Sequence, residues 1–157
     1  MDETKSPKDS AIETTHLVLP PDTNHHGTAF GGIIMQWMDI AAGIAAGRHC
    51  RMRQVVTAAV DDLEFRRPIR LGDVVLIRAC VNFVHRTSME VGVRVEREDA
   101  VTGTREHCLT GYFTFVAVDE QGQPQDVPKI APVTVDEQRR FAAAQQRRTM
   151  RLQRRKK

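Results

Sequence analysis

Sequence features that would indicate export, metal binding or membrane insertion are missing from this chain. No uninterrupted apolar run reaches the roughly 20 residues of a membrane-spanning helix, and the opening segment MDETKSPKDS lacks the apolar stretch of a signal peptide. The three cysteines are an odd number without C-x-x-C spacing, which argues against a disulfide framework and against a zinc site. We therefore expect a soluble, cytoplasmic protein with reduced cysteines, no membrane insertion and no bound metal.

Charge is unevenly distributed along the chain. The length of 157 residues suits one domain, and hydrophobic and charged contents of 41% and 27% are ordinary for a globular protein. The net charge of +3 hides a separation, because nine basic and no acidic residues follow from Arg139 onward, and the preceding residues carry a net charge of −6. Such a tail suits a phosphate-bearing partner, or it is a frayed and solvated terminus.

The first third of the chain predicts a strand, a loop and a helix. Residues 1–10 are polar, and we expect them to be disordered. The β-branched and apolar residues of IETTHLVLPP predict a short strand, and residues 22–32 have the composition of a loop. Residues 33–49 predict a helix that is apolar nearly all round and is therefore expected to be buried.

Strands are predicted after this helix, at residues 54–65, 74–84, 88–98 and 105–119. The third of them alternates between apolar and charged residues, which predicts one dry face and one partly wet face. Short links between consecutive strands favour an antiparallel meander.

The economical packing of these elements is an α+β hotdog fold, in which the antiparallel sheet wraps around one long central helix. This arrangement buries the helix and one face of the sheet together. We expect a single hotdog domain over residues 11–133. A basic C-terminal helix is expected over residues 134–157, with Thr134 or Asp136 as its N-cap.

A carboxylate, Asp39, lies inside the apolar helix segment GGIIMQWMDIAAG. Its neighbours at helical spacing offer no counter-charge. An ionised carboxylate in an apolar setting is unfavourable unless it is paired, hydrogen-bonded or hydrated. From spacing alone, Asp39 is a catalytic group, a structural carboxylate bonded to polar groups from elsewhere, or a carboxylate exposed at the helix end of a sheet edge.

A glycine pair, Gly31 and Gly32, opens the same helix. Unpaired backbone N–H groups at this positive helix end could hold a developing oxyanion; alternatively, the glycines only permit a tight turn. At ~1.5 Å per residue, Asp39 lies roughly 10 Å along the axis from Gly32. One helix therefore cannot present both features to one carbonyl group, and a cooperating site needs the partner helix of a two-fold dimer.

Four segments along residues 12–153 carry a resemblance to a known family: LPPDTNHHGTAFGGIIMQWMD, VVTAAVDDLEF, TSMEVGVRVE and DEQRRFAAAQQRRTMRLQ. In this order they resemble the hotdog-fold acyl-CoA thioesterases, the acyl-coenzyme A hydrolases that include brain and cytosolic enzymes of animals and small bacterial relatives. The resemblance implies hydrolysis of an acyl-CoA thioester to a free acid and coenzyme A. It implies no cofactor beyond coenzyme A as a ligand and product.

The resemblance also implies roles for individual residues. Asp39 matches the catalytic carboxylate, which activates water or attacks the thioester directly. Asn24 matches an asparagine that joins it from the other half of the dimer, and the amides near Gly31 and Gly32 would polarise the carbonyl group.

Coenzyme A in relatives lies along one strand and one turn, and the basic tail suits its phosphates. The matching positions are Ala58, Ala59 and Val60 on the strand, Thr87, Ser88 and Met89 at the turn, and Arg148 and Arg151 in the tail. The family also suggests three dimers around a three-fold axis.

The same sequence features are compatible with functions other than thioester hydrolysis. A non-catalytic acyl-CoA-binding or regulatory hotdog protein is the main alternative, and a hydratase on the same fold is another. The basic tail lacks the aromatic residues and the helix-turn-helix of a nucleic-acid arm, so no nucleic-acid partner is expected. His25 and His26 are interpreted as solvated or structural, Ser88 as a contact rather than a nucleophile, and Trp37 as a core or interface residue.

Overall fold

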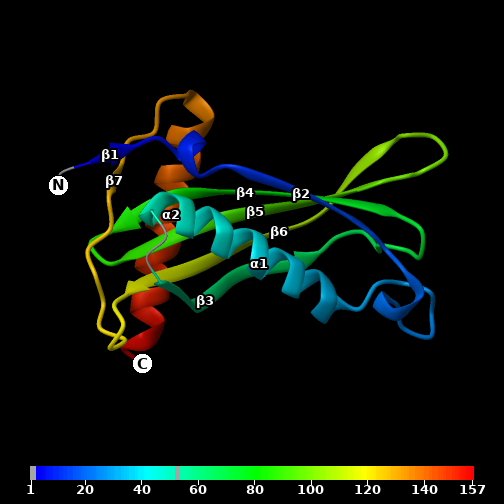
Figure 1. The fold of residues 1–157 in the computed structure, drawn as a ribbon, viewed down its shortest axis with the longest axis horizontal. Coiled ribbons are helices and arrows are strands. Elements are labelled where there is room, and N and C mark those ends of the chain that lie inside the picture. Colours follow the sequence, from blue (N-terminus) through cyan, green and yellow to red (C-terminus); the bar gives the residue numbers. More distant parts are fainter. Residues whose placement is uncertain (1–2, 52–53) are drawn as a thin grey trace.

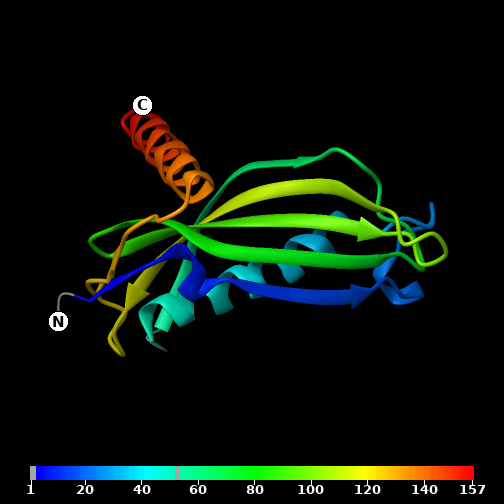
Figure 2. The same cartoon turned by 90° about the horizontal axis from the view of Figure 1, so that it is seen from above.

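The computed structural model describes residues 3–51 and 54–157. One antiparallel sheet has the strand order β2-β4-β5-β6-β3, with helices α1 and α2 on opposite faces (Figures 1 and 2). The strands are β2 (Ile12–Leu17), β3 (Gln54–Phe65), β4 (Val74–His85), β5 (Ser88–Glu98) and β6 (Arg105–Val118), and the helices are α1 (Gly31–Cys50) and α2 (Val135–Arg155). This is the predicted hotdog fold.

The predicted meander is correct for β4, β5 and β6 but wrong for β3. β3 pairs with β6 rather than with β4, so β3 and β2 form the two edges of the sheet. A tight hairpin uses roughly two to five residues, and the link from β3 to β4, residues 66–73, is longer and contains Pro68. The chain therefore crosses from one edge of the sheet to another strand.

Helix α1 packs its small-residue face on the concave side of the sheet. Ala41, Ala42, Ala45 and Ala46 are fully buried there. They meet the dry face of β5, on which the predicted alternation places four buried residues: Met89, Val91, Val93 and Val95. In the part of the chain that the structure describes, neither helix is long and apolar enough to cross a membrane.

The expectation that α1 is buried all round is wrong for a single protomer. Met35, Ile40 and Ile44 lie on the face turned away from the sheet, and Ile40 is 53% exposed. Val56 and Val60 on the edge strand β3 are exposed as well. One sheet covers only one side of a helix, so the chain leaves an apolar surface open.

The expected disorder of residues 1–10 is wrong for residues 3–10. β1 (Thr4–Lys5) pairs in parallel with β7 (Lys129–Ile130), and Pro7–Ser10 forms a 3₁₀-helix. Ser10 is fully buried; its Oγ donates to the carbonyl of Pro7 at 2.8 Å and accepts from the amide of Val81 at 2.9 Å. These hydrogen bonds order a segment whose composition alone predicts none.

Helix α2 covers part of the convex face of the sheet. Its N-cap is Thr134, one of the two predicted candidates; the amide of Glu137 donates to its Oγ1 at 3.2 Å. The side chain of Glu90 on β5, expected on the wet face, is only 3% exposed because Arg147 of α2 lies over it. The convex face is therefore wet only where α2 does not reach.

Candidate functional site

The carboxylate of Asp39 lies on the outer side of α1, where it meets the edge strand β3. Thr57 of β3 donates its Oγ1 hydrogen to Asp39 Oδ1 at 2.8 Å. This contact orients one carboxylate oxygen and leaves the second available to a substrate or water. Sequence reasoning did not single out Thr57, because a threonine inside VVTAAV is an ordinary strand-forming residue and carries no other signal.

Asn24 holds the turn that precedes α1. Its Oδ1 accepts from the amides of His26 at 2.9 Å and Thr28 at 3.3 Å, and its Nδ2 donates to Thr28 Oγ1 at 3.0 Å. Among the described residues of one protomer, no hydrogen bond joins Asn24 to Asp39. Within one protomer, the Asn24 side chain is thus engaged by its own turn rather than by Asp39.

The glycine pair forms the first residues of α1, as expected for an anion-binding helix end. The carbonyl of Phe30 accepts from the amides of Ile33 at 3.1 Å and Ile34 at 3.2 Å. Within the described ranges, the amides of Gly31 and Gly32 have no such partner. A Cβ atom on Gly32 would meet nothing within 4 Å, whereas one on Gly31 would lie 3.5 Å from the Phe65 ring, so the space beside Gly32 is open to a ligand.

A cavity of about 430 Å³ borders this helix end. Its wall includes Gly31 and Ile34 of α1, Phe65 at the end of β3, and Arg66 and Ile69 of the segment that follows. The cavity joins an apolar surface to open backbone donors. Such a combination suits the acyl and carbonyl parts of a thioester.

The predicted coenzyme A residues on β3 lie on the free edge of the sheet. Ala58 and Val60 are exposed and Ala59 is half-buried. The β3–β6 register shifts between Thr57 and Ala59, so Ala58 has no partner residue in the ladder. The backbone of this segment is therefore open to a ligand or to a second chain.

The predicted turn residues join β4 to β5. Thr87 and Ser88 are half-buried, whereas the Met89 side chain is 1% exposed and its sulfur lies 3.4 Å from Cys50 Sγ. Met89 therefore offers a ligand its backbone rather than its side chain. Arg148 of α2 reaches the same turn, with its Nη2 atom 3.1 Å from Nδ1 of His85.

Arg151, the second predicted tail residue, is engaged inside the protomer. Its Nη1 donates to Oδ2 of Asp61 at 2.8 Å, and the Arg151 and Asp61 side chains are 13% and 7% exposed. The structure thus brings Arg148 to the predicted turn but places Arg151 against β3.

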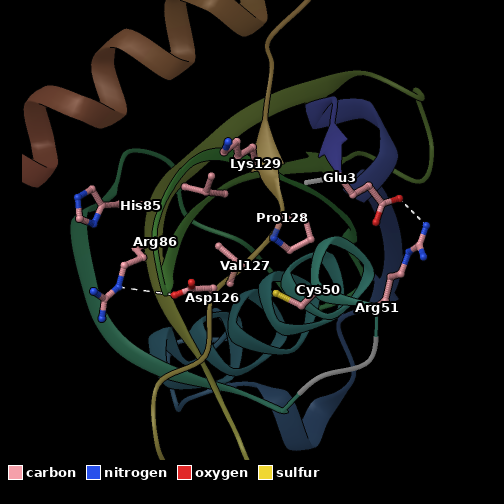
Figure 3. Close-up of a pocket in the computed structure, with 10 residues that line it drawn as sticks. Glu3, Cys50, Arg51, His85, Arg86, Asp126, Val127, Pro128 and Lys129 are labelled. Carbon is pink, nitrogen blue, oxygen red and sulfur yellow. Dashed lines mark hydrogen bonds and ion pairs between the residues drawn. The ribbon is translucent and has the colours of Figure 1, made fainter. Parts of the chain in front are cut away.

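A second cavity, of about 1010 Å³, opens at the C-terminal end of α1 (Figure 3). Arg86 pairs with Asp126 at 3.6 Å across one side, and Arg51 pairs with Glu3 on the other. Pro128, which also lines it, accepts a 2.8 Å hydrogen bond from His49 Nε2. Asp39 does not line this cavity, which adjoins the β4–β5 turn.

The side chains left without an assigned role have structural surroundings. His25 and His26 are exposed, with ring centroids 3.9 Å apart. Trp37 is half-buried and stacks on His16 at 4.3 Å, and burial lowers the pKa of His16. In the part of the chain that the structure describes, no three His, Cys, Asp or Glu side chains are grouped to hold a metal ion.

The chain is similar in sequence to known thioesterases. Residues 26–104 match the model of the Thioesterase superfamily. An uncharacterized acyl-CoA thioester hydrolase of Bacillus subtilis is 44% identical over 135 residues, which are 86% of this chain and 78% of that protein. The mouse cytosolic acyl coenzyme A thioester hydrolase is 40% identical over 128 residues, 80% of this chain, but the match spans only 33% of the mouse protein.

Solved structures share the fold over nearly the whole chain. An apo-hexameric acyl-CoA thioesterase has a TM-score of 0.93 and 39% identity, with 97% of each chain covered. An acyl-CoA hydrolase from Staphylococcus aureus, solved with butyryl coenzyme A and coenzyme A, has a TM-score of 0.91 and 38% identity. That match covers 97% of this chain and 92% of the other.

Proposed function

We propose that this chain, which belongs to the Thioesterase superfamily, hydrolyses acyl-coenzyme A to a free acid and coenzyme A. The observation that carries the proposal is the placement of Asp39. It lies on the outer side of α1, oriented by Thr57, and the same helix begins with open glycine amides. A carboxylate and a set of oxyanion donors are the groups that thioester hydrolysis needs.

The proposed site is shared between two protomers. Asp39 and the glycine amides are too far apart along one helix to serve one carbonyl group. The open apolar surface of Met35, Ile40 and Ile44, continued by Val56 and Val60 on β3, supports a homodimer in which a second helix is brought alongside. Relatives solved as hexamers support a trimer of such dimers.

In the proposed mechanism, Asp39 either removes a proton from water or attacks the thioester carbonyl itself. In the direct route, the carboxylate oxygen bonds to the carbonyl carbon, the C–S bond breaks with release of the thiolate, and water then hydrolyses the resulting anhydride to the free acid and Asp39. In the water route, the hydroxide oxygen bonds to the carbonyl carbon, the C–S bond breaks, and the proton passes to the departing thiolate. Asn24 orients the water or the carbonyl group, and the amides of Gly31 and Gly32 stabilise the negative oxygen. Thr57 keeps the Asp39 carboxylate in one orientation throughout.

The proposed coenzyme A path follows the free edge of β3 and the β4–β5 turn. The backbone of Ala58 and Val60 and the side chains of Thr87 and Ser88 line it. Arg148 lies next to this turn and suits a phosphate contact. Arg151, also proposed from the sequence, would have to divide its guanidinium group between Asp61 and a phosphate.

Variants of the Staphylococcus aureus hydrolase support the residue roles. They replace an asparagine, an aspartate and a threonine by alanine, and the numbering of the first two differs by 15. Asn24 and Asp39 have the same separation, and Thr57 follows Asp39 at nearly the spacing of the third variant residue. The cytosolic mouse relative supports a cytoplasmic location.

Thiol release from acyl-CoA tests the function. We expect turnover by the unchanged chain and a loss of about 10²- to 10⁴-fold in Asp39→Ala, with circular dichroism showing an intact fold. Glu64→Ala removes an exposed carboxylate from β3 and serves as the matched control. Unchanged turnover in Asp39→Ala would refute the assignment. Coenzyme A binding without thiol release from acetyl to palmitoyl substrates would instead favour a non-catalytic acyl-CoA-binding protein.

A further inference from the structure

Asp61 of β3 is a buried carboxylate that α2 holds from the convex side of the sheet. Arg151 Nη1 lies 2.8 Å from its Oδ2, and Arg154 Nη2 lies 3.5 Å from its Oδ1. The Arg151 and Asp61 side chains are nearly buried, whereas Arg154 is 66% exposed. The pair thus joins residues 90 positions apart and fastens the C-terminal half of α2 to the edge strand.

The β3 backbone around Asp61 is irregular. Its register with β6 shifts between Thr57 and Ala59 and again between Asp61 and Glu64. Asp62 has a φ of 52°, which is an unfavourable conformation for a residue other than glycine. Among the residues that the structure describes, no strand of the protomer pairs with the outer side of β3. This stretch therefore has fewer ladder contacts than an inner strand, and α2 supplies a restraint that the sheet does not.

Arg147 joins α2 to the two neighbouring strands of the sheet. Tyr112 of β6 is the Cα partner of Asp61, and the Arg147 guanidinium lies 3.4 Å from the centroid of the Tyr112 ring. Arg147 also binds Glu90 of β5 through two hydrogen bonds, at 2.7 and 3.0 Å. The Asp61 contact is therefore one end of a fixed attachment that spans β3, β6 and β5.

The restrained residue lies next to the proposed site. Ala58, Ala59 and Val60 directly precede Asp61, and Thr57, which orients Asp39, comes just before them. A strand advances about 3.3 Å per residue, so a shift at Asp61 is passed along a few residues of backbone. A displaced segment would fit coenzyme A less closely along its length, which weakens substrate binding and raises KM.

We propose that Arg151 and Asp61 are positioning residues that fix the Thr57–Asp61 segment of β3 for coenzyme A. The inference rests on the proposed function, because it needs the ligand to lie along this segment. It assigns Arg151 a different task from the phosphate contact suggested by the sequence, since its guanidinium acts through the Asp61 carboxylate.

Steady-state kinetics with two substrates test this assignment. Acyl-CoA carries phosphates, and the corresponding acyl-pantetheine has the same thioester without them. We expect Asp61→Asn and Arg151→Gln each to raise KM about tenfold or more for both substrates, with kcat changed less than about threefold. The double variant should be no worse than either single one, because both break the same contact.

Other results would overturn the proposal. A raised KM for acyl-CoA alone, seen in Arg151→Gln but not in Asp61→Asn, would show a direct phosphate contact. A fall in apparent kcat that matches the unfolded fraction seen by circular dichroism, at unchanged KM, would show only a loss of folded protein. If a single variant fails to fold because it leaves a buried charge unpaired, the double variant removes both charges and is measured instead.

Two further measurements separate this inference from its premise. Arg154→Gln removes the exposed arginine that also approaches Asp61, and it should change KM less than about twofold. Thiol release by the unchanged chain, with normal KM values in the Asp61 and Arg151 variants, would reject the positioning role and keep the hydrolase. No thiol release by the unchanged chain would reject the hydrolase itself and with it this inference.

Discussion

Helices α1 and α2 attach to opposite faces of one sheet by different means (Figure 2). α1 buries alanines against the concave face, so close packing holds it there. α2 places Ala144 and Phe141 against the convex face but is fastened chiefly by arginines, through Arg147 to Glu90 and Arg151 to Asp61. The same sheet thus accepts an apolar helix on one side and a basic one on the other.

The two kinds of attachment leave the helices with different freedom to bind other surfaces. Apolar packing is not directional, and α1 has apolar side chains on both sides, so it can bind a sheet and a second protomer at once. Buried ion pairs contribute little net stability, because desolvation offsets their attraction, but they favour one position of α2 over others. A protein that needs an open interface on one face and a fixed helix on the other therefore benefits from both.

The largest effect is expected from a substitution on the open apolar face of α1. Ile40→Arg places a charge on the surface proposed to join two protomers, and burying an unpaired charge is strongly unfavourable. We expect dissociation to smaller particles and a loss of thioesterase activity of about 10²-fold or more, because the shared site is incomplete. Light scattering and thiol release measure both. Met150→Arg introduces the same charge on exposed α2 and should alter neither.

The next largest effect is expected when an ion pair that attaches α2 to the sheet is removed. Arg147→Met leaves Glu90 buried without a counter-charge, and we expect the free energy of unfolding to fall by about 3–5 kcal/mol. Denaturant unfolding measures the loss. Adding Glu90→Leu removes the stranded charge and should restore most of the stability. If the double variant were as unstable as the single one, attractive pairing rather than an unpaired charge would be the cause.

A histidine at the end of α1 should make the stability of the fold depend on pH. His49, at the end of α1, is fully buried, and burial lowers its pKa despite the hydrogen bond to Pro128. Because the pKa of His49 is lower in the folded state, the unfolded chain takes up the proton at a higher pH than the folded chain does. His49 therefore stabilises the fold above the ordinary histidine value of 6.5, and this contribution is lost as the pH falls through the folded-state pKa.

Denaturant unfolding at a series of pH values tests this expectation. Below 6.5, the unchanged chain should lose up to about 1.4 kcal/mol more per pH unit than His49→Gln. Parallel curves for the two proteins would contradict it.

The smallest expected effect concerns how α2 begins. Thr134→Ala removes the oxygen that accepts from Glu137, and we expect a loss of about 1 kcal/mol. Thermal unfolding would record it as a small fall in Tm. Thr134→Ser keeps the hydroxyl and should retain most of the stability. A loss as large as that of Arg147→Met would mean that the cap, not the arginines, holds α2.

Several features could be predicted because they depend on neighbours along the chain. The alternation in β5, the apolar run of α1 and the glycine pair before it indicate their structures locally. Asp39 is recognisable in the sequence because it is a charged residue within this apolar run. Asn24 was found through a resemblance, since an asparagine in a polar loop is otherwise unremarked.

The remaining features depend on contacts between distant segments. Nothing in the sequence around Thr57 indicates its hydrogen bond to Asp39, and nothing around Arg151 indicates its partner Asp61. The sequence also did not predict that residues 3–10 are ordered, because this depends on the hydrogen bond between Ser10 and Val81 of β4.

The sequence by itself determined the two long helices, the five strands of the main sheet and the presence of a carboxylate in an apolar helix, because these follow from side-chain periodicity along a few turns or pleats. Only the tertiary structure decided that β3 lies at the sheet edge, that Thr57 orients Asp39 and that Arg151 is taken up by Asp61. Periodicity specifies which face of an element is apolar. It does not specify which distant element that face will meet, because that choice is made by packing of the whole chain.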